Sequence, residues 1–198
     1  MANATADYGF AFVRSYDVEA THIECAVLTG GSDLFVGDPV VLAGSGDSQG
    51  RPTVTRAADD TTTVNVFGVI DGIKATGSDG LNKQFSDSAD TVIVIPTMPG
   101  YVFRVNASNT TGVSLNDIGQ RMDHVQAAGD SKTGRSGYAL DVGEDGSSPS
   151  PTTNGWLLIG FDRRADNSFS TTVSTDTINV DCLVTCVESS WSNGNGAA

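Results

Sequence analysis

The feature that most constrains the fold is a succession of short apolar runs separated by glycine, proline and acidic turn residues. The clearest case is 34–57, LFVGDPVVLAGSGDSQGRPTVTRA, where two strand-like runs flank the polar segment 44–50. Gly37-Asp38-Pro39 interrupts the first run, and proline donates no backbone hydrogen bond, so we expect an edge strand or a bulge there. The segment predicts a hairpin-like corner.

Similar runs recur along the whole chain. We predict further strands at 21–27, 64–70, 91–95, 101–105, 138–142, 156–161 and 178–187. Only 114–122, SLNDIGQRM, has apolar residues at helical spacing, with Ser114 placed to cap a short helix. About nine short strands with turns between them predict a single all-β domain, a β-sandwich or barrel with the jelly roll favoured.

The two ends of the chain lack this regular pattern. We therefore expect an extended N-terminal arm at 1–20, the β-domain at 21–190 and a flexible C-terminal tail at 191–198. Four aromatic residues lie on the arm: Tyr8, Phe10, Phe12 and Tyr16. They can pack on the chain's own domain or on a neighbouring subunit, and their spacing leaves both alternatives open.

Charge and hydropathy exclude several classes of partner. The chain has 24 acidic and 11 basic residues and a net charge of -13, so it repels nucleic-acid phosphates. No stretch approaches the roughly 20 apolar residues that a membrane-spanning helix needs, and the N-terminus lacks the pattern of a secretory signal. We expect a protein made in a cytoplasm that binds neither nucleic acid nor membrane.

The three cysteines are not spaced for a shared metal or a local disulfide. Cys182 and Cys186 fall on one face of a predicted strand, roughly 13 Å apart at the usual strand rise, which is too far for either. We expect both to be small buried side chains. A pairing of Cys25 with one of them across a sheet stays open.

No motif in the sequence predicts a reaction. The glycines of 44–50 lead into a strand and not into a phosphate-binding helix, and the acids in turns do not match a calcium loop. The two histidines, His22 and His124, have no triad pattern around them. A carboxylate pair for glycoside cleavage would meet only in the fold. We predict no catalytic residue, no cofactor, no metal and no enzymatic activity.

The segment LFVGDPVVLAGSGDSQGRPTVTRAA, followed by VFGVIDGI, resembles the head decoration, or cement, proteins of tailed bacteriophages. The resemblance is strongest over 33–73. It continues through TVIVIPTMPGYVFRV, SLNDIGQRM, and the stretch from GFDRRADNSF to CLVTCVE. The chain departs from the family pattern at 74–90, at 143–154 and in its serine-rich tail.

The resemblance implies a structural virion protein on the outer surface of a capsid, where it would bridge major capsid protein subunits. It also implies a homo-oligomer, a trimer in preference to a dimer. Tyr8, Phe10, Phe12 and Tyr16 are then candidate capsid or oligomer contacts, and removing 1–20 is expected to leave the β-domain folded. The alternative is a virion receptor- or carbohydrate-binding β-module that uses Tyr101 or Trp156.

Overall fold

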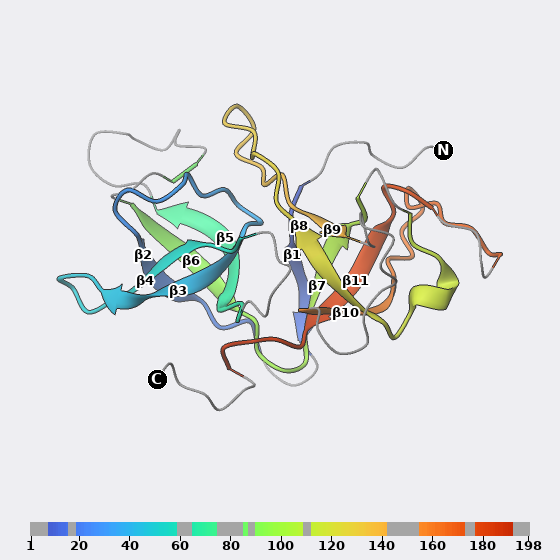
Figure 1. Cartoon of the computed structure of the whole chain (residues 1–198), viewed down its shortest axis with the longest axis horizontal. Helices are drawn as coiled ribbons and strands as arrows, with labels where there is room; N and C mark the ends of the chain where they lie inside the picture. Colours follow the sequence, from blue (N-terminus) through green and yellow to red (C-terminus); the bar gives the residue numbers. More distant parts are fainter. Residues whose placement is uncertain are drawn as a thin grey trace.

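The computed structural model describes residues 8–15, 19–58, 65–74, 85–86, 90–108, 112–141, 155–172 and 177–191. These residues form strands β1 to β11 and one turn of 3₁₀ helix, which confirms the prediction of an all-β fold. Figure 1 shows the strands in two groups that lie side by side, a closed barrel and an open sheet. This strand order differs from that of a jelly roll, which is two Greek keys in facing sheets.

The barrel is built from one continuous part of the sequence. Its strands are β2 (Ile23–Val27), β3 (Pro39–Gly46), β4 (Pro52–Arg56), β5 (Gly68–Lys74) and β6 (Thr91–Pro96). They close in the order β2-β4-β3-β5-β6, with β2 and β4 parallel and the other pairs antiparallel. The alternating apolar residues fill the interior, namely Cys25, Val27, Leu34, Val40, Val54, Phe67, Ile70, Val92 and Val94.

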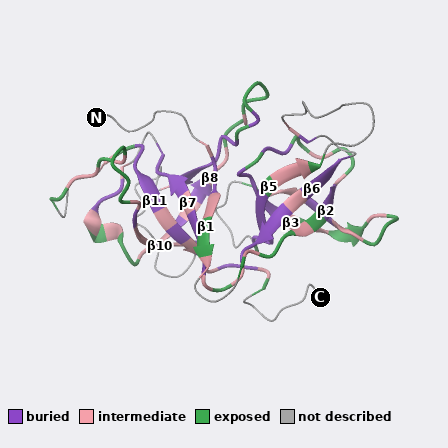
Figure 2. Cartoon of the chain, turned by 180° about the vertical axis from the view of Figure 1, so that it is seen from behind, coloured by how far each residue is buried: buried purple, intermediate pink, exposed green. Residues whose placement is uncertain are grey.

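The open sheet combines the N-terminal segment with the second half of the chain. Its strands are β1 (Ala11–Ser15), β7 (Tyr101–Asn106), β8 (Arg121–Val125), β9 (Ala139–Asp141), β10 (Trp156–Phe161) and β11 (Asp181–Cys186). Their order is β1-β7-β11-β10-β8-β9, so segments far apart in the sequence become neighbours. The buried face includes Phe10, Phe103, Tyr138 and Trp156. Figure 2 shows burial along both groups of strands and exposure at the tip of the β3–β4 hairpin.

The predicted corner at 34–57 is confirmed as the β3–β4 hairpin. Its turn is held by Asp47, whose carboxylate accepts hydrogen bonds from the backbone N–H groups of Gln49 and Arg51 at 2.9 and 2.8 Å. The prediction of an edge strand is wrong, because β3 pairs with β4 on one side and β5 on the other. Pro39 is instead the first residue of β3, a position that sheets tolerate, and Gly37 before it has a φ of 96°.

The helix predicted at 114–122 is reduced to one 3₁₀ turn, Leu115–Asp117. Its start is as predicted, since the Ser114 backbone N–H donates to the Asp117 carboxylate at 2.7 Å. Gly119, with a φ of 90°, ends the turn, and the following residues form β8. Met122 has the spacing of a strand as well as of a helix, and pairing with β10 decides between them.

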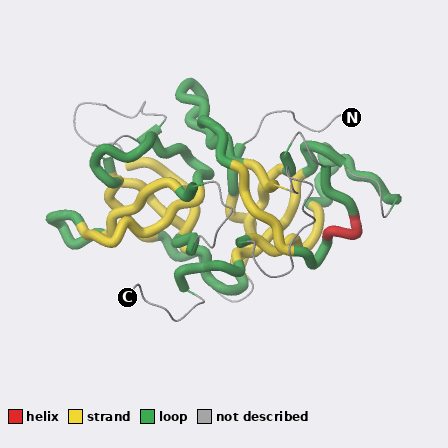
Figure 3. Tube along the Cα trace, viewed as in Figure 1, coloured by secondary structure: helices red, strands yellow, loops and turns green. Residues whose placement is uncertain are grey.

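Loops and the C-terminal segment connect the barrel to the sheet. Tyr138 donates its hydroxyl hydrogen to the Ala57 carbonyl, and the Phe10 backbone N–H donates to the Gly37 carbonyl at 2.8 Å. The loop between β8 and β9, seen in Figure 3, contacts the barrel side through a hydrogen bond from the Ser136 N–H to the Val36 carbonyl. Trp191 donates to the Phe67 carbonyl at 2.9 Å, so the tail is attached to the barrel at its first residue.

All three cysteines are free and buried, as predicted for Cys182 and Cys186. Cys25 lies in the barrel core and the other two lie in the core of the sheet, so the possible pairing across a sheet does not occur. Of the loops where the chain departs from the resembled family, all of 143–154 and most of 74–90 lie outside the described residues.

Candidate functional site

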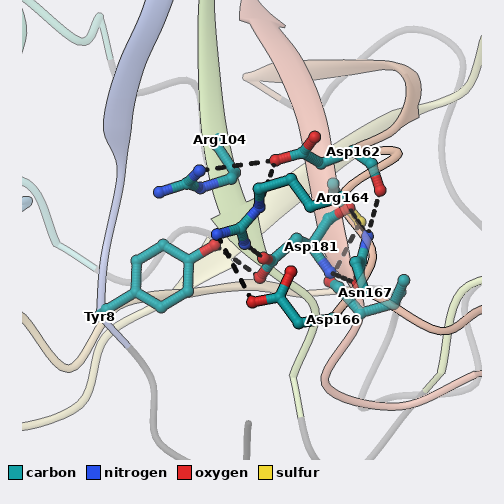
Figure 4. Close-up of polar contacts among 9 residues, drawn as sticks. Tyr8, Arg104, Asp162, Arg164, Asp166, Asn167 and Asp181 are labelled. Atoms are coloured by element: carbon teal, nitrogen blue, oxygen red, sulfur yellow. Dashed lines mark hydrogen bonds and ion pairs between the residues drawn. The ribbon is translucent and has the colours of Figure 1, made fainter. Parts of the chain in front are cut away.

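The candidate site is a pocket of about 370 Å³ beside β7 and β11, which we call the arginine pocket. Its walls come from five separate segments of the chain. The residues that line the pocket are Tyr8, Arg104, Arg135, Arg164, Asp166, Asn167, Asn179 and Asp181. Figure 4 shows most of these side chains converging on Arg164.

Arg164 is the centre of an ion-pair network. Its Nε donates to Asp162 Oδ2 at 2.8 Å, and its Nη2 donates to the Asp181 carboxylate. A third acid, Asp166, is 3.8 Å from Nη1. The guanidinium group is therefore paired with three of the chain's own carboxylates, and it fixes the turn that follows β10.

Asp181 links this network to the N-terminal segment. Its Oδ1 accepts a hydrogen bond of 2.6 Å from the Tyr8 hydroxyl. Burial, and then the hydrogen bond to Asp181, raise the pKa of Tyr8, so this residue stays a neutral hydrogen-bond donor. The Arg104 guanidinium carbon lies 5.7 Å from the centre of the Tyr8 ring, within the range of a cation–π contact.

Asn167 holds the backbone around the network. Its side-chain oxygen accepts from Asp181 N–H at 2.8 Å, and its side-chain nitrogen donates to the carbonyls of Asp162 and Asp181 at 2.6 and 2.9 Å. The turn after β10 is thereby tied to the first residue of β11. The pocket is built before any ligand arrives, which reduces the entropy cost of binding.

Three polar groups of the pocket lack a partner within the described part of the chain. Arg104 Nε and Asn179 Oδ1 are both buried and make no hydrogen bond to those residues. Asn179 is only 7% exposed and has a φ of 53°. The Arg135 side chain is exposed and has no ion pair among the same residues. A buried polar atom without a partner is costly, so Arg104 Nε and Asn179 Oδ1 point to a ligand.

His124 is a structural residue in this fold. Its Nδ1 accepts a hydrogen bond from Trp156 Nε1 at 3.3 Å, which places the ring hydrogen on Nε2, 3.0 Å from the Ala58 carbonyl. Nδ1 of this buried ring is therefore used within the sheet, and Nε2 joins the sheet to Ala58 on the barrel side. His22 is exposed and contacts Asp71 at 3.2 Å.

The thiols and acids form no catalytic or metal centre in the part of the chain that the structure describes. Burial raises the pKa of Cys25 and of Cys186 to about 12, so neither forms a thiolate at neutral pH. Among those residues, no group of three or more histidine, cysteine and acidic side chains is placed to hold a metal ion. Nor do they include a helix of the length and apolarity that crossing a membrane requires.

The predicted contact residues have different positions. Tyr8 lines the arginine pocket, and Phe10 is buried with its ring stacked on Trp156 at a centroid distance of 4.2 Å. Phe12 packs edge-on against Tyr101 at 5.3 Å. Phe10 and Phe12 thus lie on the chain's own sheet, the intramolecular alternative of the two. Tyr16 lies outside the described residues.

The prediction that Tyr101 or Trp156 forms a carbohydrate-binding surface is wrong. Tyr101 and Trp156 are 1% and 0% exposed, because both rings belong to the inner face of the open sheet. A sugar ring has no access to either side chain in this fold.

Sequence reasoning missed the arginine pocket. The signals available were the charged turn DRRADN directly after a strand and an acid, Asp181, at the start of an apolar run. Neither signal indicates that Tyr8 and Arg104 lie beside them, because that depends on the pairing of β1, β7 and β11. No protein-family model matches the chain, and no match was found among curated proteins.

Proposed function

We propose that this protein is a structural virion protein that decorates and stabilises the outside of a bacteriophage capsid by bridging major capsid protein subunits. The observation that carries the proposal is the ordered resemblance, whose strongest part, 33–73, supplies β3, β4 and nearly all of β5. The resembled residues therefore form one connected part of the barrel and are not scattered over unrelated elements.

Physical properties of the chain support the same proposal. A net charge of -13 keeps the free protein soluble and away from packaged nucleic acid. Many identical copies on a capsid lattice convert a weak contact into strong retention. We propose a homo-oligomer, a trimer in preference to a dimer, because a trimer matches the local three-fold axes of an icosahedral shell.

The internal packing of Phe10 and Phe12 changes the expected role of the arm. Residues 8–15 contribute β1 and a core ring, so removing 1–20 is expected to destabilise the sheet as well as any contact. This expectation replaces the one from sequence, in which the β-domain stays folded. Surface candidates for the lattice contact are the exposed apolar residues Val13, Val36, Leu42, Ile118, Ile178 and Trp191.

The test uses phage heads that lack this protein. Purified chain is mixed with expanded heads and with unexpanded precursors, and binding is measured by co-sedimentation and by electron microscopy. We expect saturable binding to heads and a higher temperature of DNA release. Failure to bind either kind of shell would overturn the proposal. Sedimentation velocity of the free chain separates a trimer from the 20.5 kDa monomer.

The alternative, a virion receptor- or carbohydrate-binding module, has lost its two proposed platforms because Tyr101 and Trp156 are buried. Glycan binding by a chain that binds no shell would favour this alternative.

A further inference from the structure

We propose that the arginine pocket is a binding site for one acidic side chain of a partner protein, aspartate or glutamate together with its own backbone N–H. The first step is charge. Three guanidinium groups, those of Arg104, Arg135 and Arg164, line the pocket with two carboxylates, those of Asp166 and Asp181. Asp162 also pairs with Arg104 at 3.5 Å and with Arg164 at 2.8 Å, so three carboxylates oppose the three guanidinium groups. Arg135 is the pocket guanidinium group that makes no ion pair among the described residues, and a single carboxylate matches it.

The second step is hydrogen bonding. Arg164 and Asp181 already satisfy each other, and Tyr8 donates to Asp181, so these groups form the wall of the pocket. Arg104 already donates to Asp162 through Nη1 at 3.5 Å, so its unused donor is the buried Nε, and Arg135 adds the donors of a guanidinium group without an ion pair among the described residues. Guanidinium groups bind carboxylates well because their N–H groups match the two carboxylate oxygens.

The third step is the unused acceptor. Asn179 Oδ1 is buried at the pocket and has no partner among the described residues, so the ligand must supply a donor as well as a carboxylate. The backbone N–H of an acidic residue is such a donor. A phosphate dianion would place two negative charges against the one guanidinium group, Arg135, that makes no ion pair among the described residues, and an amine would meet Arg104 and Arg135.

An acidic sugar also combines a carboxylate with donors, but the pocket does not favour it. Sugar rings usually stack on an aromatic face, and Tyr8, whose ring is already covered by Arg104, is the only aromatic side chain among the described residues that line the pocket. The volume of about 370 Å³ suits one side chain and its adjoining peptide group.

The direct test is a titration of the ¹⁵N-labelled full chain, followed by NMR. The probe is N-acetyl-glutamate α-amide, with N-acetyl-glutamine α-amide as the uncharged control. We expect the glutamate probe to shift the Arg104 Nε–H and Asn179 signals with a dissociation constant of about millimolar. The glutamine probe is expected to bind at least about tenfold more weakly. No shift at tens of millimolar probe, or equal shifts with both probes, would overturn the site.

A matched pair of variants tests the location. Arg135→Gln removes a pocket guanidinium from an exposed position and is expected to weaken binding about tenfold. Arg163→Gln makes the same charge change on an exposed residue that does not line the pocket, and it should leave binding unchanged. Equal losses in the two variants would mean a general charge effect and no site. Tighter binding of methyl glucuronide than of the glutamate probe would overturn the protein partner.

The assignment of the bound acidic side chain to a capsid subunit rests on the proposed function. Weaker shell binding by Arg135→Gln, with Arg163→Gln unchanged, would support it. A chain that binds shells but not the glutamate probe would overturn the pocket alone. A chain that binds the probe but no shell would overturn capsid decoration alone.

Discussion

The barrel and the open sheet are both antiparallel in the main, but they are assembled from the sequence in different ways. The barrel uses 23–96 in one piece, and the polar contact that shapes its β3–β4 turn joins Asp47 to Arg51, four residues apart. In the sheet, the contact between Tyr8 and Asp181 spans 173 positions. Local chemistry therefore decides the hairpin, whereas strand pairing decides the polar site. The pocket exists because distant segments meet in the sheet.

The largest effect that separates the two regions is expected from Phe10→Ala. Phe10 is 2% exposed and stacked on Trp156, so truncation should lower the free energy of unfolding by about 3–5 kcal/mol. Val13→Ala, on β1 at 44% exposure, should change it by less than about 0.5 kcal/mol. Urea unfolding followed by tryptophan fluorescence measures both. Equal small effects would mean that Phe10 does not pack in this core.

Two glycines of β5 test how closely the barrel strands β5 and β6 pack together. A Cβ on Gly68 would lie 2.5 Å from the Ile95 carbonyl oxygen, so Gly68→Ala should cost about 1–3 kcal/mol. At Gly72 the nearest atom is 3.8 Å away on the Ile93 side chain, and Gly72→Ala should be neutral or stabilising by up to about 1 kcal/mol. Thermal unfolding of the two variants gives the comparison. A neutral Gly68→Ala would show that β5 and β6 are further apart than described.

The same contrast explains what the sequence could predict. A nearly continuous apolar run identified β10 with its observed bounds, Trp156–Phe161, and the glycine-rich turn identified the β3–β4 hairpin. The helix at 114–122 was wrong because Met122 fits a strand and a helix equally, and the neighbouring strand decided. The prediction of an edge strand at Pro39 was wrong because closure of the barrel depends on strands that are distant in the sequence.

The predictions about contact residues had the same limit, since they also depend on long-range strand pairing. Aromatic spacing at Phe10 and Phe12 showed that these rings need a partner surface, but the partner turned out to be β7 and β10 of the same chain. The sequence signals near the arginine pocket did not locate it, because Arg104 and Asp181 look like ordinary strand residues until β7 pairs with β11. The sequence shows which residue types are present, but it does not show which residues become neighbours in the fold.

A smaller effect on stability is expected from Tyr8→Phe in the pocket wall. The change removes one hydrogen bond, from the Tyr8 hydroxyl to Asp181, and keeps the ring under Arg104, so the free energy of unfolding should fall by about 1 kcal/mol. Denaturant unfolding at neutral pH measures the loss. An unchanged midpoint would show that water replaces the hydroxyl at no cost. A loss as large as that of Phe10→Ala would mean that Tyr8 is part of the core.

The smallest effect is the pH dependence from Asp38, which lies where the barrel meets the sheet. Its carboxylate is 0% exposed, accepts from the Phe35 N–H at 3.0 Å and lies 3.6 Å from Arg56 Nε. Burial raises its pKa above the ordinary value of 3.8, against the opposing effects of its hydrogen bonds and of Arg56. The folded state then holds the proton more tightly than the unfolded state. The contribution of Asp38 to stability is therefore full below pH 3.8 and is lost as pH rises through the raised pKa.

Asp38→Asn isolates this contribution because the amide does not titrate. The free energy of unfolding of the variant, minus that of the parent chain, should rise as pH increases from below 3.8 through the raised pKa. Asp47→Asn is the control of opposite sign. Hydrogen bonds from Arg51 lower the pKa of Asp47, so its stabilising effect is present above pH 3.8 and disappears as pH falls. A difference for Asp38→Asn that stays constant with pH would mean that this carboxyl group is ionised at no cost, with Arg56 neutralising it fully where the two regions join.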